Sequence, residues 1–449
     1  MISHEDRVHR NRGVMSARRI AALVLLGTGV ACGSGSGGEP LGEQRQALSG
    51  ITISGRVARS NGVGIPGVTV TLSGNRYVLA STDWQGNYAF YGLPSGSYSV
   101  RPTKGGCSFS PDVENLNNLN GSTTRDFTAS GTGCTSNASA QTYTRKVLSL
   151  IFDPEVQTAS GAQRLSSYMG WSDPDTLAED QRSWFQTTSH GRLSHQIVQR
   201  TLVDDIPTKE DGFDYTVEEL LACYDDVTLC HAPDISDYLE ILETYGICDL
   251  VNAGTIDEVW MWGAPFFGFA ESRLAGPNGF WYNSSPVEGS SCNKLVPIMG
   301  YNYERGLPEV IHNYMHRAES TMSRVYGDWQ EDRMSHNFDK FGLVAVQSPS
   351  FGFSGCGSAH YSPNAVEEYQ YDNLTIEDSF CDDFFNYPNL GTPQTMLRQT
   401  SCERWNCDEL DYYRFWLRHL PAATGTGSDG KFNDWWRYVV DPNAVFLTD

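Results

Sequence analysis

The sequence predicts a multidomain protein in which a small all-β sandwich is followed by a large α/β layered domain. Residues 51–130 contain short segments of alternating polarity separated by turn residues, which is the pattern of a sandwich. Residues 143–449 instead alternate apolar segments of strand length with amphipathic segments of helical length. A stretch rich in glycine, serine and threonine at 131–142 is expected to link the two domains.

The first 32 residues have the pattern of a secretory signal. Two arginines precede an apolar core at 20–26, and the segment ends at Cys32, with Met1 and Met15 as alternative starts. The segment resembles a bacterial lipoprotein signal, and this resemblance implies that Cys32 carries a lipid. A transmembrane helix is the alternative, but the apolar run is shorter than the ~20 residues that such a helix needs.

Residues 33–50 are too polar and too rich in glycine to bury a core. They are expected to be a flexible tether with an r.m.s. reach of ~25 Å. Together with the signal, the tether predicts an exported lipoprotein anchored in the membrane at the cell envelope, on the outer surface. The formal net charge of −22 argues against a nucleic-acid partner.

Ten of the eleven cysteines remain once Cys32 is set aside. An even number in an exported chain predicts up to five disulfides, whose pairing the sequence does not reveal. A bridge between Cys107 and Cys134 would pin the start of the linker. Structural zinc is the alternative use, but the closest cysteine pairs lack the CxxC spacing of a zinc ribbon.

The segment 51–130 resembles the carboxypeptidase-regulatory-like, or Cna-B-like, family. The resemblance rests on turn motifs at the family's expected places, among them Pro66-Gly67-Val68, Gly86-Asn87-Tyr88 and Gly96-Ser97-Tyr98. It implies a β-sandwich that serves as a stalk or accessory domain, and it implies no peptidase activity.

The large domain has three apolar segments and one segment of alternating polarity that predict strands, and a fifth expected strand near its end. The expected strands are 145–152, 193–199, 256–262, 295–301 and 435–440. Segments with helical periodicity lie between and after them. The expected helices are 175–189, 217–224, 235–245, 307–326 and 409–419.

The stretch from Lys294 to Gly327 organises this domain. A helix follows the apolar strand there, with Pro308 in its first turn and Gly327 at its C-terminal stop. At 100° per residue, its apolar side chains form one broad face. They are Leu307, Val310, Ile311, Tyr314, Met315, Ala318, Met322 and Val325.

Four polar side chains line the opposite face of the same helix. Glu309, His312, His316 and Glu319 stack along one line, so two imidazoles and two carboxylates can converge on one cation. Imidazole nitrogen is a preferred zinc ligand, and carboxylates serve as ligand or base. The sequence therefore predicts a divalent metal, zinc, held by the histidines, with Glu309 or Glu319 as catalytic base. The alternative is an ordinary solvated helix face.

The segment His312-Asn-Tyr-Met-His316 resembles the HExxH signature of zinc peptidases, with one departure. Asn313 stands where those enzymes have the glutamate that serves as general base, and an amide cannot accept a proton from water. His360, in a loop rich in glycine and serine, is the predicted third ligand, and His336 and His419 are the other candidates.

The segment 257–286 is the most aromatic part of the chain, and it follows the predicted strand 256–262. The carboxyl ends of strands are where ligands bind in open α/β sheets, so its aromatic rings are predicted to bind a glycan or a peptide. The predicted contacts are Trp260, Trp262, Phe267, Trp281 and Tyr282. The alternative is a connection held down by buried rings. Glu258 and Glu271 are a candidate carboxylate pair for glycoside hydrolysis.

These observations leave two functions open. One is a surface-anchored, metal-dependent hydrolase of peptide or glycan, and the other is a non-catalytic surface lipoprotein that binds carbohydrate or protein. Residues 143–449 resemble a group of exported bacterial proteins to which no activity is attached, so that resemblance does not decide. Asn313 favours the binding protein, whereas the four converging polar side chains favour the hydrolase, which is our working interpretation.

Overall fold

The computed structural model describes residues 50–392 and 396–447. The predicted signal and the lipidation site Cys32 lie outside the described residues, as does the predicted tether up to residue 49. No helix in the described ranges is both long enough and apolar enough to cross a bilayer.

The N-terminal domain is a β-sandwich, as the sequence predicts. One sheet has the order β4-β1-β9-β6, with β8 also paired to β1, and the other has the order β3-β2-β5-β7. The strands are β1 (Ile51–Ala58), β2 (Thr69–Gly74), β3 (Val78–Ser81), β4 (Asn87–Leu93), β5 (Gly96–Thr103), β6 (Ser108–Ser110), β7 (Glu114–Leu119), β8 (Thr123–Thr124) and β9 (Phe127–Ser130). Alternation places one face of each strand in the core. In β2, for example, Val70 and Leu72 are fully buried while their neighbours are not.

A five-stranded sheet forms the first part of the large domain, with strand order β13-β10-β14-β16-β15. The strands are β10 (Tyr143–Phe152), β13 (Leu193–Val203), β14 (Glu258–Gly263), β15 (Ser272–Ala275) and β16 (Val296–Asn302). Four of them run parallel, and only β15 is antiparallel to its neighbour β16. Both faces are covered, so β14 and β16 are buried along almost their whole length, as their continuous apolar sequences predict.

Helices and short strands complete the domain around this sheet. The helices are α1 (Leu165–Met169), α2 (Pro174–Thr188), α3 (Val217–Asp225), α4 (Tyr238–Thr244), α5 (Ile247–Asn252), α6 (Leu307–Tyr326), α7 (Asn337–Phe341), α9 (Glu409–His419) and α10 (Trp436–Val440). The 3₁₀ turns are η1 (Val227–Leu229), η2 (Cys381–Asn386), η3 (Cys402–Trp405) and η4 (Pro442–Phe446). The short strands pair two by two as β11 (Glu155–Thr158) with β12 (Gly161–Arg164), β17 (Glu377–Ser379) with β18 (Arg398–Thr400), and β19 (Ala422–Thr426) with β20 (Phe432–Asp434).

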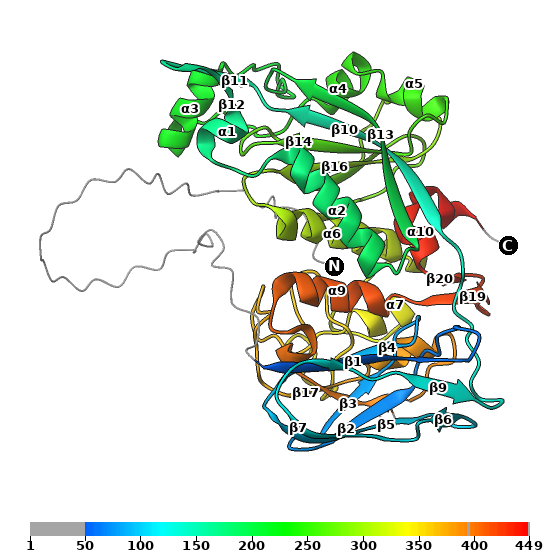
Figure 1. The fold of residues 1–449 in the computed structure, drawn as a ribbon. Helices are drawn as coiled ribbons and strands as arrows, with labels where there is room; N and C mark the ends of the chain where they lie inside the picture. Colours follow the sequence, from blue (N-terminus) through cyan, green and yellow to red (C-terminus); the bar gives the residue numbers. More distant parts are fainter. Residues whose placement is uncertain (1–49, 393–395, 448–449) are drawn as a thin grey trace, which may run out of the picture.

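Helix α6 lies between the sheet and the C-terminal part of the chain (Figure 1). It begins after Gly306, has Pro308 in its first turn and ends at Gly327, whose φ of 97° is left-handed, as the sequence predicts. Val310 packs in the core beneath the sheet, whereas Ile311 packs in the core formed with the C-terminal helices. The helix is therefore buried on most of its circumference, and both cores fix its position.

The β-sandwich packs directly on the C-terminal part of the large domain (Figure 1). Trp84 of the sandwich is 3% exposed and its ring meets Phe385 edge-on at 6.3 Å. Asp83 also forms an ion pair of 3.0 Å with His190 of the large domain. Within the predicted linker 131–142, the Ser139 amide donates to Ala422 at 2.7 Å. The sandwich is thus docked on the domain that carries the candidate site.

All ten cysteines outside the N-terminal signal are paired, which agrees with the predicted five disulfides. The pairs are Cys107–Cys134, Cys223–Cys230, Cys248–Cys292, Cys356–Cys381 and Cys402–Cys407. Disulfides persist in oxidising compartments, so the pairing indicates an exported protein.

Candidate metal centre

Three histidines converge at one point beside α6. His316 Nε2 lies 2.9 Å from His312 Nε2 and 3.0 Å from His360 Nε2. One ligand atom of each ring can be chosen so that all three lie within 4.8 Å of one another. His312 and His316 are one turn apart on α6, whereas His360 comes from a loop 44 residues further along the chain. The structure therefore brings together the three residues that the sequence predicts as metal ligands.

The outer nitrogens of the two helix histidines each have a defined partner. His316 Nδ1 donates to Glu319 Oε2 at 2.9 Å, and His312 Nδ1 donates to the Tyr413 hydroxyl oxygen at 3.1 Å. Tyr413 in turn donates to Glu409 at 2.7 Å. Such outer contacts fix the tautomer and the orientation of a ligating imidazole, so both Nε2 atoms are directed into the cluster.

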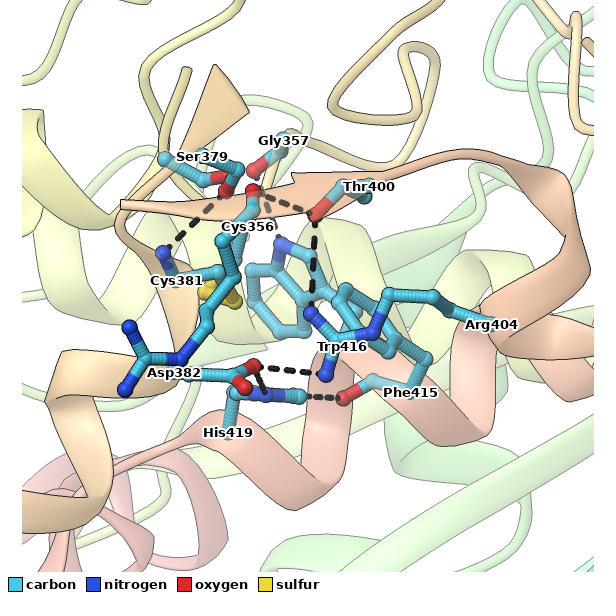
Figure 2. Close-up of a disulfide and its surroundings, with 12 residues drawn as sticks. Cys356, Gly357, Ser379, Cys381, Asp382, Thr400, Arg404, Phe415, Trp416 and His419 are labelled. Carbon is cyan, nitrogen blue, oxygen red and sulfur yellow. Dashed lines mark hydrogen bonds and ion pairs between the residues drawn. A yellow bond between two sulfur atoms is a disulfide. The ribbon is translucent and has the colours of Figure 1, made fainter. Parts of the chain in front are cut away.

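Three of the residues just before His360 anchor the loop that carries it. The Cys356–Cys381 disulfide holds its start, and Trp416 Nε1 donates to the Gly357 carbonyl at 2.9 Å (Figure 2). The Ala359 amide then donates to Glu319 Oε1 at 2.7 Å. Glu319 thus binds both His316 and the loop of His360, which fixes the two histidines relative to each other.

The donor set fits zinc. Zinc prefers nitrogen ligands at 2.0–2.1 Å in tetrahedral geometry, which requires about 3–4 Å between ligand atoms. Burial, followed by the neighbouring imidazoles, lowers the pKa of His312 well below its usual value, so its ring is neutral and able to ligate. Burial also lowers the pKa of His316, but the hydrogen bond to Glu319 and the nearby carboxylates outweigh it and raise that pKa to about 9. A zinc ion bound at this cluster at neutral pH would therefore have to displace a proton from His316.

The two glutamates predicted as catalytic base lie in different settings. Glu319 is 7% exposed and both its carboxylate oxygens are engaged, so it positions His316 and the loop that carries His360. Glu309 forms an ion pair of 2.9 Å with Arg305 one turn away. Its side chain is 19% exposed and lies at the start of α6.

Two further side chains lie beside the Nε2 atoms of the cluster. Glu271 Oε2 is 3.8 Å from His316 Nε2, and the Tyr369 hydroxyl is 3.2 Å from His360 Nε2. The sequence singles out Glu271 only as part of a glycoside pair, and Tyr369 not at all. Glu271 comes just before the edge strand β15, which pairs with β16, and β16 leads into α6. This position in the chain is the signal that could have placed Glu271 near the histidines.

Four of the five aromatic residues predicted to bind substrate belong to the core. Trp260, Trp262, Phe267 and Tyr282 have no exposed surface, so no ligand can reach them. The prediction is therefore corrected to a packing role for these four. Trp281 is 63% exposed and remains available as a binding residue.

The glycoside pair of Glu258 and Glu271 does not form. Glu258 is fully buried and forms a 3.0 Å ion pair with Arg317 on α6. Burial raises the pKa of Glu258, but Arg317 and His195 outweigh it and hold the pKa far below its usual value. Glu258 is a structural anion that no substrate reaches.

The two other histidines considered as third ligand have structural roles. His336 precedes α7, where its Nδ1 accepts from the Asp339 amide at 3.1 Å. His419 is buried at the end of α9, with Nε2 3.1 Å from Asp382 and Nδ1 donating to the Phe415 carbonyl at 2.7 Å (Figure 2). Arg404 completes this buried group through Asp382 at 2.6 Å.

The sandwich of this chain matches the model of a known family. Residues 52–130 match the model of the carboxypeptidase regulatory-like domain. This segment is a carboxypeptidase regulatory-like domain. No curated protein matches the chain.

The solved structures with similar parts include a cohesin–dockerin complex and two pilin subunits. One is a type II cohesin–X–dockerin complex from Acetivibrio cellulolyticus, at 21% identity and a TM-score of 0.14, covering 17% of this chain and 52% of that chain. The major pilin subunit of Bacillus cereus has 17% identity and a TM-score of 0.15, covering 18% and 30%. The minor pilin of Streptococcus agalactiae has 14% identity and a TM-score of 0.16, covering 19% and 47%. The chain thus spans about half the length of these matches or less.

Glu331 gives the region around the His360 loop a pH-dependent stability. Burial, opposed by hydrogen bonds from Ser358 and Gln347 and aided by nearby carboxylates, raises its pKa from 4.5 to about 7. Between these values the folded protein binds more protons than the unfolded chain, so stability falls as pH rises through this window. Glu331→Gln is expected to stabilise the protein by about 2 kcal/mol at pH 8 and by much less at pH 5. Thermal denaturation at both pH values measures this, and equal gains would contradict the assignment.

Proposed function

We propose that residues 143–449 form an α/β layered domain that acts as a zinc-dependent hydrolase. Its ligands are His312, His316 and His360, and an N-terminal signal with a lipid on Cys32 anchors the protein at the outer surface of the cell envelope. The observation that carries the proposal is the convergence of the three ring nitrogens within 4.8 Å of one another. Outer hydrogen bonds orient the two helix histidines of this set, as expected for metal ligands.

The surroundings of the cluster favour amide hydrolysis over glycoside hydrolysis. Glycosidases use two carboxylates that flank the scissile bond, and Glu258 is unavailable because Arg317 engages it in the core. A zinc ion held by three histidines polarises a carbonyl and lowers the pKa of a coordinated water. Because His316 is 12% exposed and Glu271 is 32% exposed, the centre has access to solvent. A peptide is therefore the favoured substrate, with Trp281 as an exposed contact.

A non-catalytic binding protein is the second candidate. The observation in its favour is Asn313, which stands where zinc peptidases have their general base and which is 2% exposed. In that case the three histidines hold a structural metal or none, and Trp281 contributes to a surface that binds carbohydrate or protein. Zinc-dependent turnover separates the two functions.

Zinc content tests the proposal. Purified wild-type protein is expected to hold one zinc per chain by mass spectrometry of the metal, and His316→Ala is expected to hold almost none. Removing one of three ligands should weaken binding by more than the ~10–100-fold that outer-contact mutations cost. His336→Ala is the matched control and should retain zinc, because His336 caps α7 away from the cluster. If wild type and His316→Ala both held only trace zinc, the result would contradict the metal centre and therefore also the zinc-dependent hydrolase.

A further inference from the structure

The helix that carries two of the proposed ligands has no carboxylate at the position where zinc peptidases carry their general base. Asn313 occupies that position and donates its side-chain amide to the Gly300 carbonyl at 2.8 Å. This contact ties α6 to β16, so Asn313 has a packing role. An amide cannot accept a proton, so a hydrolase built on this cluster needs a carboxylate from a position other than 313 as its base.

Two carboxylates contact His316, one at each ring nitrogen. Glu319 lies at Nδ1, the outer nitrogen, and is occupied by His316 and by the Ala359 amide. Glu271 lies at Nε2, the nitrogen that faces His312 and His360, with its Oε2 at 3.8 Å. A water that reacts at the cluster would lie near the Nε2 atoms, and of these two carboxylates Glu271 is the one on that side of His316. Glu271 is therefore placed to act as a base, whereas Glu319 is placed to orient the His316 ring.

Glu271 is held in place by groups outside α6. Its backbone carbonyl accepts from the Gly300 amide at 3.1 Å, at the start of the edge strand β15. Its Oε2 also accepts from the Asn283 side-chain amide, which restrains the carboxylate. The side chain is 32% exposed, against 7% for Glu319, so water and substrate can reach it. A restrained carboxylate with solvent access beside the ligand nitrogens is the arrangement that base catalysis requires.

We propose that Glu271 is the general base of the hydrolytic reaction, supplied by the sheet edge because position 313 of the helix is an asparagine. This inference rests on the proposed hydrolase function. The Glu271 carboxylate takes a proton from a water molecule, and the water oxygen bonds to the carbonyl carbon of the scissile amide. The carbon–nitrogen bond then breaks, and the proton passes from Glu271 to the leaving amine. One water is consumed, and the products are a carboxylic acid and an amine.

The test compares Glu271→Gln with wild type in three measurements: zinc content, zinc affinity by chelator competition, and zinc-dependent hydrolysis of fluorescently labelled casein. Glu271→Gln is expected to keep one zinc per chain and to lose about 10²–10⁴-fold in hydrolysis rate. Its zinc affinity should change by less than about tenfold, because the three histidines remain. Glu288→Gln, an exposed carboxylate variant in the following loop, is the matched control and should retain wild-type rate.

The outcomes separate this inference from the hydrolase proposal. Full casein hydrolysis by Glu271→Gln with zinc retained overturns Glu271 as the base, as does a comparable loss found in Glu309→Gln instead. Loss of zinc in Glu271→Gln also overturns it, because Glu271 is then a fourth ligand that closes the site. Wild-type protein that holds zinc but hydrolyses nothing refutes the hydrolase itself, and the base with it.

Discussion

Arg317→Ala is expected to destabilise the protein by about 3–5 kcal/mol, because it removes the nearest cationic partner of the buried Glu258 carboxylate and leaves its charge poorly compensated. Arg317 has no exposed surface and donates to Glu258 at 3.0 Å. It also donates to the carbonyls of Val439 and Val440 at 3.2 and 2.8 Å, which joins α6, β14 and α10. Denaturant unfolding monitored by tryptophan fluorescence measures the loss of unfolding free energy.

A neighbouring arginine of the same helix provides the control. Arg324 is exposed and reaches only ring faces, with Phe280 at 5.8 Å and Phe446 at 5.9 Å, so Arg324→Ala should cost less than about 1 kcal/mol. The double variant Arg317→Met with Glu258→Leu should recover much of the stability that Arg317→Ala loses, since it removes both buried charges. Equal, small losses in the two single variants would show that the ion pair does not hold the three elements together.

Removal of the Cys356–Cys381 disulfide is expected to damage both stability and zinc binding. The bridge closes a loop with a sequence separation of 25, for which chain entropy predicts a cost of about 3 kcal/mol. It also fixes the loop that ends at His360, so the double alanine variant should bind zinc about 10–100-fold more weakly, as found when outer contacts of a ligand are lost. Unfolding in denaturant and chelator competition measure the two effects.

The Cys223–Cys230 bridge is the matched comparison. It closes a loop with a sequence separation of only 7, at the end of α3, and none of the cluster residues lies in that loop. Its double alanine variant should lose less stability and should retain the zinc affinity of wild type. Unchanged zinc affinity in the Cys356–Cys381 variant would show that the hydrogen bonds of the loop suffice to place His360.

Elements with a consistent local pattern could be predicted from the sequence. The turn residues of the sandwich and the apolar runs that became β10, β14 and β16 each carry their own signal, because strand burial follows from residues close in sequence. The boundaries of α6 follow from Pro308 and Gly327 in the same way. The segment 435–440 is an exception. Its aromatic and β-branched residues predict a strand, yet it forms the short helix α10, because packing against α6 overrides propensity.

Long-range geometry limited the prediction of the site. His312 and His316 share one helix, so their spacing is visible in the sequence, and the loop around His360 offers a disulfide as an indirect signal. Glu271 became adjacent to His316 only because β15 follows β14 in the chain but pairs antiparallel at the far side of β16. Burial of Trp260 and Trp262 likewise depends on what covers the sheet, which a local pattern does not record.

The most direct test of the metal centre is a crystal structure of the purified protein with diffraction data collected on both sides of the zinc absorption edge. We expect one anomalous zinc peak per chain, about 2.0–2.1 Å from nitrogens of His312, His316 and His360, with Glu271 outside bonding distance. A peak bound elsewhere, or no peak in protein exposed to zinc, would contradict the proposed metal centre.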